Sequence, residues 1–215
     1  MVAFRPISDH GLLVEVADTP AVRRLDRALA AEPFAGFLEA VPAFVTLAVV
    51  FDPLVTDHGA VEAHLRRLLA LPGEDAGLGA ERVVEVCYEG APDLAEVAGR
   101  CGLSEAAVIA AHLAGAYEVV MYGFAPGYAY LSGVPVALHL DRKPAAVRGV
   151  AAGSVIIAGA QCLVTTLMMP TGWWVIGRSP NRVLTGDAVR PFLFDVGDRV
   201  QFRRITRDAL GQGGR

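Results

Sequence analysis

The second half of the chain is divided into short apolar stretches by glycine and proline, and this pattern constrains the fold more than any other feature. The stretches lie at residues 117–122, 155–157, 163–168, 173–176 and 199–203. They have the length of strands rather than helices, and the glycines and prolines between them favour turns. The pattern predicts a closed β-barrel or a β-sandwich.

The first half has a different pattern, in which pairs of extended stretches alternate with amphipathic helices. The extended stretches are residues 2–7, 11–16, 36–41 and 44–51. We expect Thr19 to cap one helix, with Pro20 at its first position, and Asp57 to cap a second. The order ββαββα predicts a four-stranded sheet covered on one face by two helices, which is a small α+β domain.

A glycine- and proline-containing run at residues 71–80 predicts a linker between two domains. We therefore expect a first domain at residues 1–75 and a second at residues 82–206. The second domain is expected to begin with one strand and two short helices. These elements are predicted at residues 82–88, 93–100 and 104–114.

Charge and cysteine content exclude several classes of protein. The 19 Lys and Arg and 23 Asp and Glu residues give a formal net charge of −4, without a basic block suited to nucleic acid or a membrane surface. The three cysteines lack CxxC spacing, which argues against a disulfide framework and a zinc site. Residues 1–6 lack the features of an export signal, so we expect a cytoplasmic protein. Hydrophobic residues are 53% of the chain, which predicts a buried subunit interface as well as a core.

The most unusual segment is residues 123–133, with the sequence GFAPGYAYLSG. Its glycines, proline and aromatic residues are not typical of an ordinary strand or helix, and they favour a loop that lines a ligand site. The alternative is a glycine-rich barrel corner whose aromatic residues lie in the core. The segment lacks the spacing and the lysine of a phosphate-binding loop.

Two further glycine-bracketed segments follow at residues 153–161 and 170–180. Gln161 is expected at a strand end, where its amide can bind a carboxamide or a carboxylate. The alternative is that both segments are barrel strands with their turns and no further role. Cys162 beside it is either a nucleophile or, as is usual for a cysteine in a strand, a small core residue.

Four motifs together resemble one family, which is known as the 5-oxoprolinase B subunit, allophanate hydrolase subunit 1 or KipI family. The family runs GFxPGFxYLxGLP, GSVxIAGxQ, PGGWxxIGRTP and GDRVRF are similar to residues 123–135, 153–161, 170–180 and 197–202. The resemblance implies a carboxyltransferase-like protein in which a small α+β domain precedes a cyclophilin-like β-barrel domain.

The resemblance also implies an activity. Members work with a second carboxyltransferase-like protein, which is the 5-oxoprolinase C subunit or allophanate hydrolase subunit 2 type, and in some cases with a third, the 5-oxoprolinase A subunit. Such a complex uses ATP, with Mg²⁺, to open 5-oxo-L-proline to L-glutamate, and we expect this chain to be inactive alone. One alternative is a KipI-like protein that inhibits a sensor histidine kinase. Another is a diverged member whose pocket takes a different small molecule.

The resemblance assigns site residues by position. It implies His112, Arg142 and Gln161 as catalytic residues, with no metal ligands. His112 would transfer a proton or hydrogen-bond the substrate, unless it is a helix-end histidine satisfied by backbone. The implied substrate-binding residues are Phe124, Tyr128, Tyr130, Arg148 and Trp173.

Two departures from the family fall where the site is expected. The family's second arginine before the GSV run corresponds to Val147, and Arg148 replaces it only with a shift of one residue. Residues 162–169 lack a tyrosine, a proline and an acid that the family carries there, and the strand is more apolar. These changes leave the substrate open.

Overall fold

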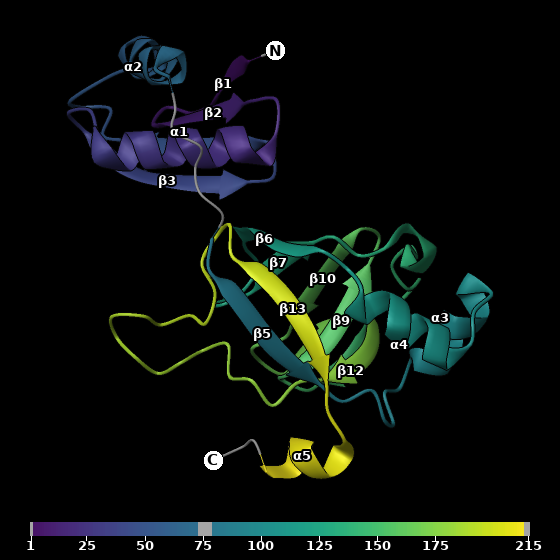
Figure 1. Cartoon of the computed structure of the whole chain (residues 1–215). Helices are drawn as coiled ribbons and strands as arrows, with labels where there is room; N and C mark the ends of the chain where they lie inside the picture. Colours follow the sequence, from purple (N-terminus) through teal and green to yellow (C-terminus); the bar gives the residue numbers. More distant parts are fainter. Residues whose placement is uncertain (1, 73–78, 213–215) are drawn as a thin grey trace. The chain divides into compact units, whose positions relative to one another are not determined.

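The computed structural model describes residues 2–72 and 79–212, which form two compact units, residues 1–78 and 79–215 (Figure 1). The predicted linker at 71–80 falls mostly on residues 73–78, which lie outside the described residues. Within the described part of the chain, none of the helices is both long and apolar enough to cross a bilayer.

The first unit is an antiparallel sheet packed against two helices. Its elements are β1 (Ala3–Ser8), β2 (Gly11–Glu15), α1 (Thr19–Ala31), β3 (Phe37–Ala43), β4 (Thr46–Phe51) and α2 (His58–Ala70). The strands lie in the order β1-β2-β4-β3. Every second residue of β4, namely Leu47, Val49 and Phe51, is fully buried and packs with residues of both helices. This alternation shows that both helices cover the same face of the sheet.

The helix caps of this unit match the sequence prediction at one helix and not at the other. Asp57 caps α2 as predicted, since its side chain accepts a hydrogen bond from the Ala60 N–H at 2.9 Å. The prediction that Thr19 caps α1 is wrong. Asp18 is the cap and accepts from the Ala21 N–H at 2.8 Å, while Thr19 is already helical.

The second unit contains a larger, mainly antiparallel sheet. Its strands are β5 (Glu81–Val86), β6 (Tyr117–Tyr122), β7 (Ala129–Ser132), β8 (Val147–Val150), β9 (Ser154–Ala158), β10 (Gln161–Val164), β11 (Met169–Thr171), β12 (Trp174–Arg178) and β13 (Arg199–Arg204). Its helices are α3 (Leu94–Cys101), α4 (Glu105–Leu113), the short η1 (Val136–Leu138) and α5 (Arg207–Gln212).

The strand order brings the last strand back to the first. The path β6-β7-β10-β9-β12 is antiparallel, and β13 pairs with β6 and, in parallel, with β5. Beyond β5, Cys87 pairs with Arg178 at the end of β12, and the distance from N–H to C=O is 2.8 Å in both directions. Strands β8 and β11 form a separate two-stranded sheet.

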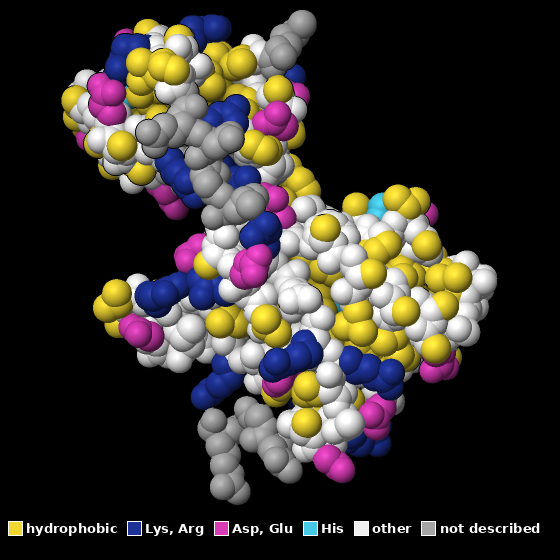
Figure 2. Space-filling model, in the orientation of Figure 1, with side chains coloured by type: hydrophobic (Ala, Val, Ile, Leu, Met, Phe, Trp, Pro, Cys, Tyr) yellow, Lys and Arg dark blue, Asp and Glu magenta, His cyan; other side chains and the backbone are white. Residues whose placement is uncertain are grey.

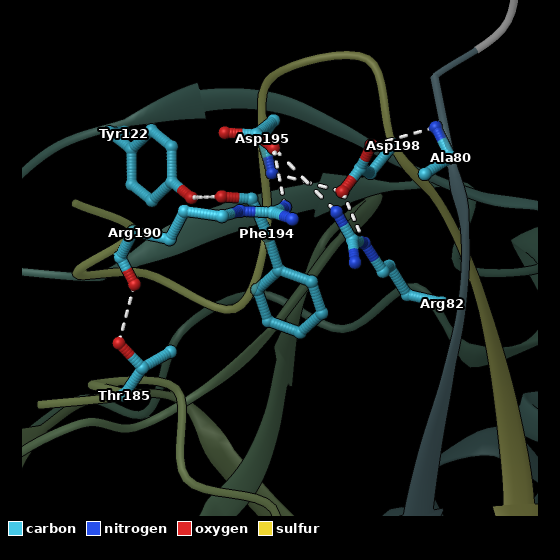
Figure 3. A network of polar contacts seen from close by, with 8 residues as sticks. All are labelled: Ala80, Arg82, Tyr122, Thr185, Arg190, Phe194, Asp195 and Asp198. Atoms are coloured by element: carbon cyan, nitrogen blue, oxygen red, sulfur yellow. Dashed lines mark hydrogen bonds and ion pairs between the residues drawn. The ribbon is translucent and has the colours of Figure 1, made fainter. Parts of the chain in front are cut away.

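A buried aspartate holds the beginning and the end of this unit together (Figure 3). Asp198 accepts from the Ala80 N–H at 2.8 Å, from Arg82 Nε at 2.7 Å and from the Asp195 N–H at 3.0 Å. Only 3% of Asp198 is exposed. The Tyr122 hydroxyl donates to the Phe194 carbonyl in the same region. The Asp of the GDRVQF run therefore has a structural role.

Two strand predictions in the second unit are corrected. Residues 129–132 of the glycine-rich segment form a strand, because the glycine and proline that prevent pairing lie before Ala129. The stretch predicted at 163–168 divides into the end of β10 and the start of β11. The hydroxyls of Thr165 and Thr166 donate to backbone carbonyls at 2.8 Å, which interrupts the strand between them.

Candidate functional site

The strands of the second unit have two apolar faces. One set of side chains points into the main core, and the alternating set forms a smaller cluster on the opposite face. We call the smaller set the outer-face cluster. It consists of Tyr128, Val150, Ile156, Ala158, Leu163, Trp173 and Val175, with Ala125, Tyr130 and Met169 packed against them. Three aromatic residues predicted to bind substrate, Tyr128, Tyr130 and Trp173, therefore lie together.

Arg142 and Phe124 extend this cluster toward solvent. The Tyr130 and Trp173 rings meet edge to face with centroids 5.8 Å apart, and the Arg142 guanidinium carbon lies 5.7 Å from the Trp173 centroid. Phe124 meets Tyr128 edge to face at 5.5 Å and is 72% exposed. The result is an aromatic wall with a cation at its rim, which suits a flat or apolar ligand that carries a negative charge.

The loop at 123–128 is held in place by its own sequence. Gly127 has φ +72°, and an added Cβ would lie 2.8 Å from Leu184 Cδ2, so a side chain does not fit there. The Thr166 hydroxyl donates to the Pro126 carbonyl at 2.8 Å. Phe124 has φ +69°, a conformation that non-glycine residues rarely adopt. Such strain is found preferentially at ligand-binding and catalytic sites.

A buried ion pair positions Arg142. The neighbouring Lys143 places its Nζ 2.6 Å from Asp93 Oδ2, and the Val175 N–H donates to the same oxygen at 2.6 Å. The Lys143 N–H donates to the Gly172 carbonyl at 2.7 Å. These contacts fix the backbone beside the start of β12 and leave the Arg142 side chain exposed. No sequence pattern singles out Asp93 and Lys143, because they lie fifty residues apart.

Burial keeps the tyrosine hydroxyls of this site protonated. It raises the pKa of Tyr128 and of Tyr130, and the nearby Arg142 charge opposes the rise at Tyr130. Both hydroxyls are therefore hydrogen-bond donors at neutral pH. They can bind a carbonyl or carboxylate oxygen, but they are poor proton acceptors there.

Gln161 and Arg148 lie at different places. Gln161 is the first residue of β10, opposite Ala158 and Ser132, and strand alternation puts it on the same face as Leu163 of the outer-face cluster. It is half-buried. Arg148 lies on β8 and lines a separate cavity of about 490 Å³.

The structure does not bring His112 to Arg142 and Gln161. His112 is fully buried in the main core of the second unit. Its Nδ1 lies 2.7 Å from the Tyr88 hydroxyl, and its Nε2 lies 3.6 Å from Cys162 Sγ. Burial lowers the pKa of His112 to about 3 and raises the pKa of the Cys162 thiol, so both are neutral near pH 7. These surroundings fit a core histidine and a small core cysteine.

The burial of His112 predicts a pH-dependent stability. The unfolded histidine binds a proton below about pH 6.5, whereas the folded one stays neutral down to a pH of about 3. The unfolded state therefore binds more protons in this window, and the free energy of unfolding should fall by about 1.4 kcal/mol for each pH unit lost between them. Urea unfolding at pH 7.0, 6.0 and 5.0 measures this slope.

The His112→Gln variant tests whether this residue is the cause. It should remove most of the slope between pH 6 and 5. Substitution of His10, which is exposed on the first unit, serves as the control and should leave the slope unchanged. An equal slope in wild type and His112→Gln would contradict the assignment.

Comparison with known proteins identifies the family. The family model for the carboxyltransferase domain, subdomains C and D, matches residues 2–194. The chain belongs to this carboxyltransferase-domain family. A 5-oxoprolinase B subunit of Bacillus subtilis is 37% identical over 189 residues, covering 81% of this chain and 78% of that protein. A protein of the same name from Escherichia coli O157:H7 is 41% identical over 121 residues, covering 55% of this chain and 56% of that protein.

Among solved structures, the same fold is found within longer chains. The crystal structure of TTHA0988 is 36% identical with a TM-score of 0.79, and the match covers 95% of this chain. The present chain spans only 40% of TTHA0988. The match of the carboxyltransferase-domain fold therefore concerns one part of that longer protein.

The carboxyltransferase-domain site described here is equipped to bind a ligand. Its aromatic rings, tyrosine hydroxyls, guanidinium and amide can hold a small anionic ring, but the outer-face cluster contains no histidine or carboxylate to move a proton. Among residues 2–72 and 79–212, no group of three His, Cys, Asp or Glu side chains is placed to hold a metal ion.

Proposed function

We propose that this chain is a subunit of a 5-oxoprolinase-type complex that opens 5-oxo-L-proline to L-glutamate with ATP. The observation that carries the proposal is the 37% identity to the Bacillus subtilis 5-oxoprolinase B subunit, which extends over 81% of this chain. Since that protein is named as one subunit among several, the name supports a second, carboxyltransferase-like partner and allows for a third. The lack of a proton-transfer group in the outer-face cluster supports inactivity of the chain alone.

The proposal extends to the fold of the second unit, as a closed barrel of the cyclophilin-like type. The pairing of Cys87 with Arg178 supports it, because this bridge connects the strand that follows the path β5-β13-β6-β7-β10-β9 back to β5.

The reaction requires activation of an unstrained amide. ATP supplies a phosphoryl group to the lactam oxygen, and the β–γ P–O bond breaks to release ADP. One water then adds to the activated carbon, and the ring C–N bond breaks to leave an amine and an acyl phosphate. A second water releases phosphate and leaves the carboxylate of glutamate.

In this proposal the chain binds and orients the lactam. The Arg142 guanidinium pairs with the substrate carboxylate, and the ring methylenes pack against Trp173 and Tyr130. The Gln161 amide hydrogen-bonds the lactam group. Burial behind the aromatic wall excludes water from one side of the ring, while the partner protein contributes the proton-transfer groups.

The first test is isolation of the complex from its native cells through a tag on this chain, with untagged cells as the control. We expect a carboxyltransferase-like partner to co-purify and glutamate to form from 5-oxoproline only when ATP is present. Co-purification of the partner without glutamate would contradict the proposed substrate. Inhibition of a histidine kinase by this chain would instead favour the KipI-like alternative.

Arg142→Ala should lower kcat/KM of the complex by about 10- to 100-fold, because a charge-assisted hydrogen bond to the substrate is lost. Most of the change should appear in KM, and Arg142→Lys should recover part of it. Arg190→Ala removes the same charge from an exposed loop and should leave both constants unchanged. Equal kinetics for Arg142→Ala and Arg190→Ala would remove Arg142 from the site.

A further inference from the structure

A second cavity of the second unit is lined by three arginines. It measures about 490 Å³ and lies where the chain leaves β5 and where β12 ends. Arg148 of β8, Arg178 of β12 and Arg207 of α5 all line it, and Glu89 is the acidic residue among its lining side chains. Three arginines and one glutamate leave two formal positive charges around a single cavity. This set shares only Arg148 with the site residues predicted from the sequence.

Glycines make this convergence possible. At Gly177 an added Cβ would lie 2.6 Å from Val86 Cγ2, so the glycine allows β12 to approach β5 and places Arg178 at their junction. At Gly90, which has φ +73°, an added Cβ would lie 2.1 Å from a terminal nitrogen of Arg207. That guanidinium uses the space and donates to the Glu89 carbonyl at 3.1 Å.

The three guanidiniums differ from other arginines of the second unit in their lack of an acidic partner within the described residues. Arg199 pairs with Glu81, for example, at 2.7 Å. In residues 2–72 and 79–212 no ion pair is formed by Arg148, Arg178 or Arg207, and all three side chains are exposed. On the face shown in Figure 2, dark-blue Lys and Arg side chains lie close to α5. Unpaired like charges around one cavity repel each other, and a bound anion would relieve that repulsion.

We propose that this cavity binds the phosphate groups of a nucleotide-sized ligand. Guanidinium groups bind phosphate oxygens in bidentate pairs, and two excess positive charges match a diphosphate or triphosphate better than a single carboxylate. A volume of about 490 Å³ is within the range of small-molecule sites and exceeds what a five-membered lactam fills. The site is separate from Arg142 and Trp173, which do not line this cavity.

The test is direct binding to the full chain, measured by isothermal titration calorimetry at fixed ionic strength. The probes are pyrophosphate, ATP, adenosine and 5-oxoproline. We expect pyrophosphate and ATP to bind and adenosine to fail, since the cavity supplies charge for phosphate. The choice of ATP rests on the proposed function, whereas the choice of pyrophosphate rests on the arginines alone. Tighter binding of ATP than of pyrophosphate would identify a nucleotide as the source of the phosphate.

Variants decide whether binding occurs at this cavity. Arg178→Ala should weaken pyrophosphate binding at least tenfold, and Arg178→Lys should weaken it less, because lysine keeps the charge and loses the bidentate geometry. Arg66→Ala removes an equal charge from an exposed helix of the first unit and should leave binding unchanged. Circular dichroism checks that each variant is folded.

Three results would overturn the proposal. They are no pyrophosphate binding up to millimolar concentration, equal weakening by Arg178→Ala and Arg66→Ala, and binding of 5-oxoproline in place of pyrophosphate that Arg178→Ala abolishes. Each is distinct from failure of the proposed function, which is read from glutamate formation by the complex. Turnover by a complex whose chain does not bind pyrophosphate would reject this cavity and leave the proposed function intact.

Discussion

Replacing Asp198 with alanine should lower the free energy of unfolding of the second unit by about 3–5 kcal/mol, the range for removal of one partner of a buried ion pair. Asp198 is 3% exposed and accepts from two backbone N–H groups and from Arg82. The substitution leaves the two N–H groups and the guanidinium without this acceptor. Urea unfolding followed by tryptophan fluorescence measures the change, because both tryptophans lie in this unit.

Asp195 provides the matched control. It also contacts Arg82, at 3.6 Å, but its side chain is 71% exposed. Exposed ion pairs contribute little, so Asp195→Ala should cost less than about 1 kcal/mol. If the two alanine variants lost equal stability, the assignment of a structural role to burial of Asp198 would be wrong.

Gly133→Ala should be as damaging, with an expected loss of about 3–5 kcal/mol from backbone strain and overpacking together. Gly133 has φ +101°, and an added Cβ would lie 2.0 Å from the Ala116 carbonyl oxygen. Neither the strain nor the clash can be relieved by rotation of a side chain. The same unfolding measurement applies, and a lower yield of soluble protein is expected.

Gly159→Ala separates strain from clash. Gly159 also has a positive φ, +53°, but an added Cβ would meet no atom within 4 Å. We expect a loss of about 1–2 kcal/mol from the backbone alone. A Gly133→Ala variant no less stable than Gly159→Ala would show that the chain near Ala116 moves to accommodate a methyl group.

The elements are predictable where local chemistry decides them. The capping residues Asp57 and Ser104 precede their helices as expected, with side chains that accept from N–H groups at 2.9 and 3.2 Å. Thr19 is a wrong cap because Asp18 before it competes for the same position, and spacing alone cannot decide between adjacent capping residues. The strand at 129–132 escapes prediction because its pairing partners, not its composition, determine its conformation.

The candidate site is only partly predictable. Tyr130 and Trp173 are identified from motif resemblance, and strand alternation explains why they share a face. His112 cannot be placed from sequence, since the contacts that bury it come from Tyr88 and Cys162, which are 24 and 50 residues away. Arg178 stands within a motif that draws attention to its glycines instead. Arg207 carries no local signal, because an arginine after the last strand looks like any solvated residue.

The parallel pairing of β5 with β13 has a consequence for how the protein is made. Arg199 lies beside Glu81, so the two strands are 118 residues apart in the chain. At about 5–20 residues per second, a ribosome needs roughly 6–24 s to add the intervening residues. During that time β5 has emerged with no strand to pair with. Protection of this one edge by a chaperone, rather than the stability of the finished sheet, is then expected to limit the yield of folded protein.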